Sequence, residues 1–368
     1  MPVDRPRASG SPTISEVAAE AGVGRATAAR TLGDYGYVSP ELRERVLAAA
    51  EKLGYRANAL ARSMSTGVSH TLGVVVADIG NPFFAGVVRG ISDTTRKRGF
   101  DALVLSTYEE LDEEVAATNV LLDKRVDGII IASAAVSRRE VSHIRTALDR
   151  GVPVVLVDRA IASLDLHAVI SDNREAAREA VTALTTAGHR RIGFVWGPPV
   201  PEPPTTRRGL FAASARNLWT DSERLRGYLD ALDDAGILFD PQLVMVGPKT
   251  EQRATYEVDR MLGLTDRATA FFCTETDAMT GALRALRARK LSYPGDVSLI
   301  GFDDSAWAAV MDPPLTMIEQ PVHQLGAAAA AVLLDTLSGN GSEPATHTLP
   351  SRFVVRSSVA PPRVPAGE

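Results

Sequence analysis

The sequence contains only one cysteine, Cys273, and no long hydrophobic run. A single cysteine cannot form an internal disulfide, and its place at the end of the apolar segment Thr269–Cys273 indicates a small buried side chain. No stretch reaches the roughly 18 apolar residues that a membrane-spanning helix needs, and Met1–Thr13 lacks the apolar core of a signal peptide. These absences predict a soluble, cytoplasmic protein that does not enter a membrane.

The usual marks of a catalytic site are also missing. The chain has no Gly-x-Ser-x-Gly element and no Gly-rich phosphate loop after a predicted strand. The adjacent pair Asp303-Asp304 has no further ligand nearby in sequence and is a weak signal for a metal or for catalysis. No metal-ligand spacing relates the six histidines, which are His70, His143, His167, His189, His323 and His347. We therefore expect no enzyme, no metal and no cofactor.

What is present is enough apolar sequence for two or three globular units. The chain has 368 residues, of which 45% are hydrophobic and 23% charged. Residues 13–67 show a purely helical pattern, whereas Val/Ile/Leu-rich runs alternate with amphipathic stretches from Leu72 onward. Such alternation predicts parallel sheets that are covered by helices on both faces.

The alternation runs through two successive series, so the fold class is α/β, with an all-α head followed by two doubly wound parallel-sheet lobes. The predicted strands of the first series are Leu72–Ala77, Ala102–Ser106, Gly128–Ala132 and Val152–Asp158. Those of the second are Ala168–Ile170, Arg191–Trp196, Val244–Val246, Thr269–Cys273 and Val297–Phe302. The Pro-rich segment 197–220 predicts a surface excursion. A cleft between the lobes is the expected ligand site.

The expected organisation has four parts. A disordered tail occupies residues 1–11, a helix-turn-helix domain residues 12–56 and a hinge residues 57–68. The sensor spans residues 69–360, with lobe 1 at about 69–166 plus 301–325 and lobe 2 at about 167–300 plus 326–360.

Three short helices form the predicted head. Thr13 and Glu16 have the spacing of a capping box, Gly22 supplies a tight turn, and Ser39-Pro40 begins a third helix that ends at Gly54. Together with Val38-Ser39-Pro40 and the segment Leu53–Arg62, the run Thr13–Val23 resembles the DNA-binding head of the LacI/GalR family of bacterial repressors. The alternative is a helical cap that packs on the sensor.

The resemblance implies that the second helix enters the major groove of double-stranded DNA. By this resemblance Arg25, Ala26 and Arg30 occupy the base-reading positions, where an arginine can pair with guanine and an alanine can offer only a methyl contact. Thr13, Gly24 and Thr27 are also expected at the DNA. Glycine at position 24 and alanine at position 29 replace the usual serines, so two phosphate contacts through side chains are missing. Backbone amides at the start of this helix can still hold a phosphate.

The segment after the head matches the family's hinge. In the family it becomes helical when two subunits meet over the minor groove, and the resemblance gives Asn58, Ala61 and Met64 roles there, Met64 as the wedge between base pairs. Alanine at position 57 replaces the usual proline, which leaves the unfolded segment more conformational freedom. The alternative is a plain flexible linker.

Polar and aromatic residues follow the predicted strands, where open α/β sheets bind ligands. Asn81-Pro82-Phe83-Phe84 resembles an element of ribose-type sensors whose aromatic rings stack on a sugar, although one of the two rings could be core. Charged or polar residues at later strand ends, and one helical arginine assigned by resemblance, complete the predicted ligand site: Asp158, Arg159, Arg224, Thr276, Asp277 and Asp303. The alternative roles are helix caps and salt bridges between the lobes.

Lys249 stands where some family members have an aromatic residue, and Thr276 replaces a common asparagine. Lys249 slightly favours an acidic or phosphorylated effector over a neutral sugar. The whole sequence predicts a repressor that binds a pseudo-palindromic operator as a homodimer or tetramer and responds to a small carbohydrate-like effector. A solute-binding protein of a sugar transporter and an α/β enzyme are the alternatives.

Overall fold

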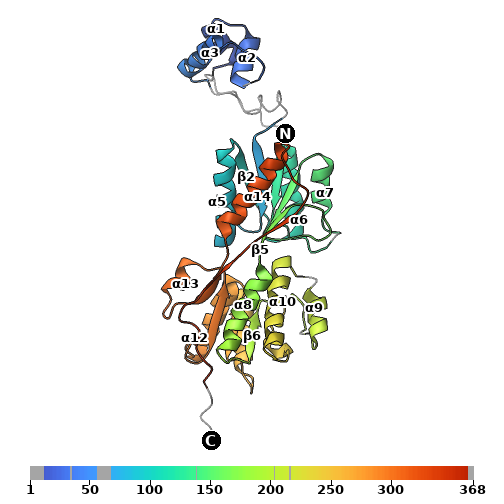
Figure 1. The fold of residues 1–368 in the computed structure, drawn as a ribbon, viewed down its shortest axis with the longest axis vertical. Coiled ribbons are helices and arrows are strands. Elements are labelled where there is room, and N and C mark those ends of the chain that lie inside the picture. Colours follow the sequence, from blue (N-terminus) through green and yellow to red (C-terminus); the bar gives the residue numbers. More distant parts are fainter. Residues whose placement is uncertain are drawn as a thin grey trace, which may run out of the picture. The chain divides into compact units, whose positions relative to one another are not determined.

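A computed structural model describes residues 12–33, 35–55, 68–137, 139–202, 204–214 and 217–363. The chain divides into two compact units, Met1–His70 and Thr71–Glu368 (Figure 1). The expected tail 1–11 and the hinge residues Asn58, Ala61 and Met64 lie outside the described residues. None of the helices in the described ranges is long and apolar enough to cross a lipid bilayer.

The head consists of three helices, α1 (Ile14–Glu20), α2 (Arg25–Gly33) and α3 (Pro40–Leu53). The capping box is present: the Glu16 amide donates to Thr13 Oγ1 at 3.3 Å, and the Thr13 amide donates to Glu16 Oε2 at 2.6 Å. Gly22 turns the chain between α1 and α2 with a φ of 62°, a region that favours glycine. The three helices enclose a small core of Val17, Ala18, Ala21, Ala28, Val46, Ala49 and Ala50.

Lobe 1 is a six-stranded parallel sheet with the strand order β10-β5-β4-β3-β1-β2. Its strands are β1 (Thr71–Val76), β2 (Asp101–Ser106), β3 (Gly128–Ile131), β4 (Val154–Val157), β5 (Ala168–Ser171) and β10 (Thr346–Leu349). Its helices are α5 (Pro82–Lys97), α6 (Leu111–Asp123), α7 (Ser142–Asp149) and α14 (Val322–Leu337). Alternate side chains of β1 point to opposite faces: Val74 packs under α5 and α14, and Val75 under α6 and α7.

Lobe 2 has a five-stranded sheet in the order β11-β9-β8-β7-β6, in which only β11 runs antiparallel. Its strands are β6 (Ile192–Val195), β7 (Ala270–Cys273), β8 (Ser298–Phe302), β9 (Thr316–Glu319) and β11 (Arg352–Val354). Its helices are α8 (Asn173–Thr186), α9 (Arg207–Ser214), α10 (Trp219–Asp234), the 3₁₀ turn η1 (Pro241–Leu243), α11 (Glu251–Leu262), α12 (Thr276–Arg289) and α13 (Ala306–Val310). Helices α8 and α10 cover one face of the sheet, and α11 and α12 the other. Cys273 is buried in this core, as predicted.

The predicted limits of the lobes are wrong. The chain crosses between the two sheets after β5, after β9 and after β10 (Figure 1). Strand β9 therefore belongs to lobe 2, and α14 and β10 to lobe 1, opposite to the prediction. Strand β8, predicted in the second series although the predicted limit at residue 301 divides it, belongs to lobe 2. Strand β5, predicted to begin lobe 2, completes lobe 1. Hydropathy identifies a strand, but pairing with distant strands decides which sheet it joins.

Two local predictions also need correction. Residues 244–246 do not form a strand of the sheet, because only Val244 makes an isolated bridge, to Phe194. The Pro-rich excursion contains a helix, α9, whose Leu210 is fully buried against lobe 2. Proline prevents a helix in the first part of this segment but not after Thr206, where proline no longer occurs.

Close helix crossings organise both lobes. At the crossing of α5 and α14, a Cβ added to Gly326 would lie 1.9 Å from the Val87 carbonyl oxygen, and one added to Gly90 would lie 2.1 Å from the His323 carbonyl oxygen. At the crossing of α8 and α10, a Cβ on Gly227 would lie 2.2 Å from the Arg174 carbonyl oxygen. These glycines let the backbones approach to distances that no larger residue permits.

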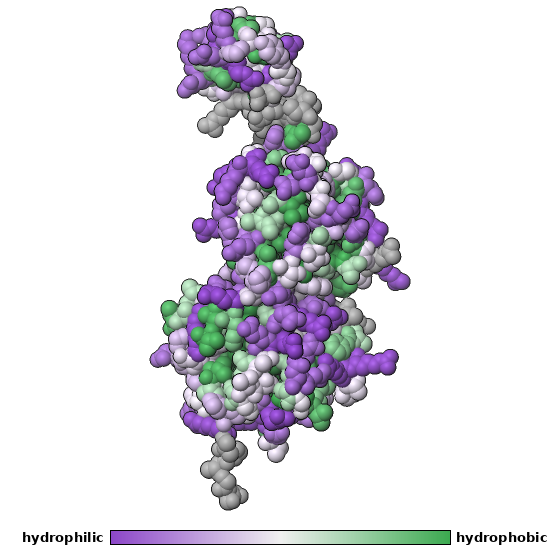
Figure 2. All heavy atoms as spheres, in the orientation of Figure 1, coloured by the Kyte–Doolittle hydropathy of each residue, from purple (hydrophilic) through white to green (hydrophobic). Residues whose placement is uncertain are grey.

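The outer side of the α8–α10 pair carries charge rather than apolar surface. Arg174 pairs with Asp230 and Arg178 with Asp234, each at 2.7 Å. Figure 2 shows the resulting hydrophilic region over these two helices. Exposed ion pairs of this kind contribute little stability, so the buried crossing holds the helices together.

Candidate ligand-binding cleft and DNA-reading surface

A cavity of about 460 Å³ lies between the two lobes, at the carboxyl ends of their parallel strands. Lobe 1 contributes residues that follow β1, β2 and β4, and lobe 2 contributes residues from the ends of β6, β7 and β8 and from α10. The cavity is lined by Ala77, Asp78, Gly80, Asn81, Pro82, Phe83, Phe84, Tyr108, Glu109, Asp158, Arg159, Trp196, Leu218, Thr220, Asp221, Arg224, Glu275, Thr276, Asp277 and Asp303. Its volume suits a small organic molecule.

Two aromatic rings at the start of α5 form part of the wall. Asn81 begins the helix, because its Oδ1 accepts a hydrogen bond from the Phe83 amide at 2.9 Å. Phe83 and Phe84 meet edge to face with ring centroids 5.0 Å apart, and each is less than 8% exposed. Both rings also line the cavity, so neither belongs to the core alone.

Strained backbone is concentrated around this cavity. Five of its lining residues other than glycine have φ values in the left-handed region: Tyr108 (53°), Glu109 (63°), Asp158 (69°), Trp196 (111°) and Asp303 (66°). Such conformations cost roughly 1–3 kcal/mol each and persist where the surrounding structure imposes them, as it often does at binding sites. Each of these five residues lies just after the end of a strand.

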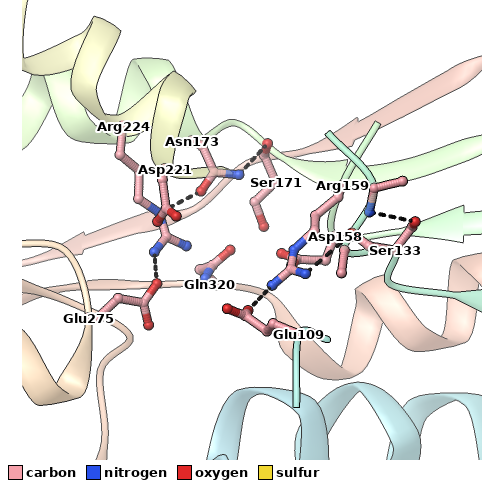
Figure 3. A network of polar contacts seen from close by, with 12 residues as sticks. Glu109, Ser133, Asp158, Arg159, Ser171, Asn173, Asp221, Arg224, Glu275 and Gln320 are labelled. Atoms are coloured by element: carbon pink, nitrogen blue, oxygen red, sulfur yellow. Dashed lines mark hydrogen bonds and ion pairs between the residues drawn. The ribbon is translucent and has the colours of Figure 1, made fainter. Parts of the chain in front are cut away.

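Arg159 is the central cation of lobe 1. Its guanidinium group pairs with Glu109, lies 3.2 Å from Asp158 and donates to the Ser133 carbonyl oxygen at 3.3 Å (Figure 3). It also lies over the Phe84 ring, 5.9 Å from the centroid. The group is almost completely buried and points toward the cavity with little freedom to move.

A buried carboxylate supports this side of the cavity from behind. Glu114 on α6 accepts hydrogen bonds from Ser133 Oγ and from the Ala134 amide, both at 2.6 Å. His143 Nε2 lies 2.6 Å from the same carboxylate. Glu114 therefore fixes the segment after β3, in which the Ser133 carbonyl oxygen accepts the hydrogen bond from Arg159.

Arg224 is the corresponding cation of lobe 2. It donates to Asn173 Oδ1 at 2.8 Å and to the Thr274 carbonyl oxygen and Glu275 Oε1, both at 2.7 Å. Its guanidinium carbon lies 3.9 Å from the centroid of the Phe302 ring. In Figure 3 this group and the Arg159 group stand on opposite sides of Gln320.

Two of these contacts reach the segments that cross between the lobes. Asn173, the partner of Arg224, is the first residue of α8, directly after the first crossing. Gln320 lies between β9 and α14, at the second crossing, and donates to Asp303 Oδ1 at 2.5 Å. Ligand-facing side chains are thus bonded to the segments about which the lobes would move.

Burial shifts the ionisation of the acidic groups. Desolvation raises the pKa of Asp158 to about 6 although Arg159 opposes it, and it raises the pKa of Glu275 to about 8 although Arg224 opposes it. Burial also raises the pKa of Asp303. Burial alone would lower the pKa of Arg159 and Arg224, but the neighbouring carboxylates outweigh it and raise the pKa of both. Burial therefore favours the protonated form of these three carboxyl groups, while both arginines stay charged.

These shifts predict that the sensor loses stability between about pH 5 and pH 8. A carboxyl group whose pKa is raised on folding binds its proton more tightly in the folded state, so the free energy of unfolding falls as the pH rises through that range. The melting temperature should be higher at pH 6 than at pH 8. Asp158→Asn should flatten this dependence, whereas Asp335→Asn at an exposed ion pair should not; equal slopes would contradict the assignment.

Every predicted ligand residue except Lys249 lines the cavity: Asn81, Phe83, Phe84, Asp158, Arg159, Arg224, Thr276, Asp277 and Asp303. Lys249 Nζ instead pairs with Asp221, whose carboxylate does line the cavity. Its charge is already balanced within the protein, which removes the reason for expecting an acidic ligand. Asp304, the neighbour of Asp303, pairs with Arg356 at 2.6 Å.

Several lining residues were missed by the sequence reasoning, notably Tyr108, Glu109, Trp196, Asp221 and Glu275. Four of them end or closely follow a predicted strand, so the strand-end rule applied to every strand would have found them. Asp221 carried no such signal. It follows the Pro-rich segment, and only the packing of α10 brings it to the cavity.

Most of the predicted DNA-reading residues of the head are exposed to solvent. Gly24, Arg25, Ala26 and Arg30 are exposed along the start and outer face of α2, and Thr27 is half-buried. The first amides of a helix have no partner within it, so the start of α2 can bind an anion even though position 24 is glycine. Thr13 is exposed at the start of α1.

The two units match known families separately. Residues 13–58 match the bacterial regulatory proteins of the lacI family, and residues 69–357 match the periplasmic binding proteins and sugar-binding domain of the LacI family. The chain belongs to the LacI family. The match of the head to bacterial regulatory proteins distinguishes the predicted regulator from its two alternatives. The chain is therefore a transcriptional regulator and not an enzyme or a transporter's binding protein.

Relatives and solved structures span nearly the whole chain. The HTH-type transcriptional regulator GalS of Salmonella typhimurium is 32% identical over 348 residues, which is 95% of this chain and 96% of GalS. A complex of the transcriptional regulator CelR with cellobiose is 30% identical, with a TM-score of 0.68, and the match covers 94% of this chain and 99% of CelR. The Lac repressor dimer bound to operator and the anti-inducer ONPF is 24% identical with a TM-score of 0.80, over 95% of this chain and 99% of that one, and shows the same fold.

Proposed function

We propose that this regulator acts in the cytoplasm as a homodimer that represses transcription from a pseudo-palindromic operator. The observation that carries the proposal is the exposed start of α2, where Arg25 and Arg30 stand beside free helical amides in a head of the family's type. Two heads related by twofold symmetry double the contact with DNA that one small head makes. Asn58, Ala61 and Met64 complete the DNA contacts in this proposal.

The effector in this proposal is a sugar or a sugar derivative. The cavity combines aromatic walls at Phe83 and Phe84 with carboxylate and guanidinium groups, which together suit a ring with an apolar face and many hydroxyl groups. CelR, a relative of similar length, has been solved with cellobiose. Arg224 and Asp303 are the strongest candidates for contacts, and Asp158, Arg159 and Asp277 are next.

Closure of the lobes links the two activities. A ligand that bridges Arg159 of lobe 1 and Arg224 of lobe 2 favours a closed arrangement. Arg224 donates a hydrogen bond to Asn173, and Asp303 accepts one from Gln320, so two ligand-facing residues are bonded to the segments that cross between the lobes. A ligand held by these residues can therefore change the angle between the lobes. A ligand that binds the closed lobes more tightly than the open lobes increases the closed population. If the closed and open forms differ in their affinity for the operator, the ligand changes that affinity by the same free energy by which the operator changes the affinity for the ligand.

The test is selection of DNA sequences by the purified full-length protein, followed by binding measurements with and without sugars. A preferred sequence with inverted-repeat symmetry, bound less tightly as salt is added, is the expected result. A panel of mono- and disaccharides should contain a member that changes this affinity. No preference over random duplexes at low salt, with or without any sugar, would contradict the proposal.

Arg30→Ala should weaken binding to the selected operator by about 1–3 kcal/mol and relax the preference for one base pair, because a bidentate arginine–guanine contact is lost. Lys52→Ala is the matched control. It removes a cation on α3 that pairs with Glu20 at 2.5 Å and should leave the base preference unchanged. Fluorescence anisotropy with single-base operator variants measures both, and an unaltered preference in Arg30→Ala would exclude this residue as a reader.

A further inference from the structure

The charges around the cavity do not balance. Seven carboxylate residues line it against two arginines: Asp78, Glu109, Asp158, Asp221, Glu275, Asp277 and Asp303 against Arg159 and Arg224. Both guanidinium groups are already paired within the protein, Arg159 with Glu109 and Arg224 with Glu275, and Lys249 is paired with Asp221. Of the other four carboxylates, only Asp158 forms an ion pair among the described residues, and it shares that cation, Arg159, with Glu109.

Asp158 is the clearest of these unbalanced groups. It is 4% exposed and faces the cavity, yet in the described part of the chain no donor makes a hydrogen bond to its carboxylate. Its one ionic neighbour is Arg159 Nε at 3.2 Å, and that nitrogen itself lacks a properly oriented hydrogen bond. Buried carboxylates are normally satisfied by donors, so this one is available to a ligand.

Gln320 adds a second unsatisfied acceptor nearby. Its Nε2 donates to Asp303, whereas its buried Oε1 has no partner among the described residues. Figure 3 shows Gln320 between the Arg159 and Arg224 groups. Acceptors rather than donors are therefore in excess at the centre of the site.

A metal ion does not fit this arrangement. Within the described ranges, no three His, Cys, Asp or Glu side chains come together as a metal site. An acidic or phosphorylated ligand would meet repulsion from Asp158, Asp303 and Asp277. A neutral sugar could donate hydroxyl protons but would leave buried negative charge uncompensated, whereas a protonated amine supplies both a charge and three donors.

We propose that the cleft selects an amino sugar, with the protonated amine placed against Asp158 and Asp303 and the ring against Phe83 and Phe84. This inference rests on the proposed function of the cleft as a sugar site and narrows the ligand class. The raised pKa of Asp158 is in keeping with it, since burial outweighs the opposing effect of Arg159 and Arg224 on this carboxyl group.

The test compares matched sugars on the full-length protein by calorimetry at neutral pH. Glucosamine, galactosamine and mannosamine are each paired with the parent hexose and with the N-acetyl derivative, which has the nitrogen but no charge. At least one amino sugar should bind about tenfold or more tightly than both of its neutral counterparts. Neutral sugars that bind as well as or better than every amino sugar would overturn the inference while leaving the proposed function intact.

Asp158→Asn keeps the size of the side chain and removes its charge. It should reduce the preference for the amino sugar over the parent hexose, measured as the ratio of their two affinities in the same variant, by about tenfold. Asp112→Asn, at an exposed position of α6, should leave the preference unchanged. An unchanged preference in Asp158→Asn would exclude the proposed contact, and a protein that binds no amino or neutral sugar at all would contradict both this inference and the proposed function.

Discussion

Replacing Arg224 by methionine is expected to lower the free energy of unfolding of the sensor by about 3–5 kcal/mol and to abolish its response to ligand. Arg224 is 2% exposed, and methionine of similar length would leave Glu275, Asn173 and the Thr274 carbonyl group without their donor. Unpaired groups of this kind, rather than the lost attraction itself, account for most of the expected cost. Urea unfolding can be followed by tryptophan fluorescence, because all three tryptophans lie in the sensor.

The double variant Arg224→Met/Glu275→Gln tests this explanation. Replacing the Glu275 carboxyl group by a neutral amide should recover part of the lost stability, since the site then no longer buries an ionisable group without its partner. It should not recover the ligand response, because the guanidinium group is still missing. Equal stability of the single variant and the parent, or a double variant less stable than the sum of the single changes, would contradict the role assigned to this pair.

Gly326→Ala is expected to destabilise lobe 1 by about 3 kcal/mol, a large effect for one methyl group. The added Cβ would lie 1.9 Å from the Val87 carbonyl oxygen, and backbone cannot move aside as a flexible side chain can. Helices α5 and α14 would have to separate, which disturbs the core that includes Val87, Leu325 and Ala329. Thermal unfolding of the full-length protein measures the loss.

Gln324→Ala is the matched control on the same helix. Residue 324 is exposed, so the change to alanine affects helix propensity but no packing, and we expect a difference within about 0.5 kcal/mol. If Gly326→Ala unfolds at the same temperature as this control, the close approach of the two helices is not what stabilises lobe 1.

The head was the most predictable part of the fold because its signals are local. The capping box at Thr13 and Glu16, the turn at Gly22 and the end of α3 at Gly54 each involve residues a few positions apart. Most strands of the sensor were also predictable, since a strand buried on both faces reads as a continuous apolar run. The assignment of strands and helices to lobes failed at β5, β9, β10 and α14.

The candidate ligand site shows the same division. Residues that directly follow predicted strands, such as Asp158 and Asp303, were found because the carboxyl ends of parallel strands meet at one edge of a sheet. Lys249 was assigned a ligand role that the structure does not place at the cavity, because its partner Asp221 lies 28 residues away in sequence. A local pattern cannot show that a charge is already balanced.

By itself the sequence determined the class of the molecule: a helical head of the LacI type, two α/β lobes and polar strand ends in a cleft, all properties of neighbouring residues. Only the tertiary structure decided which sheet each strand joins, which charges are paired and which carboxylates are left for a ligand. The physical reason is that pairing, burial and electrostatic balance depend on atoms brought together from distant parts of the chain, and no local pattern records those contacts.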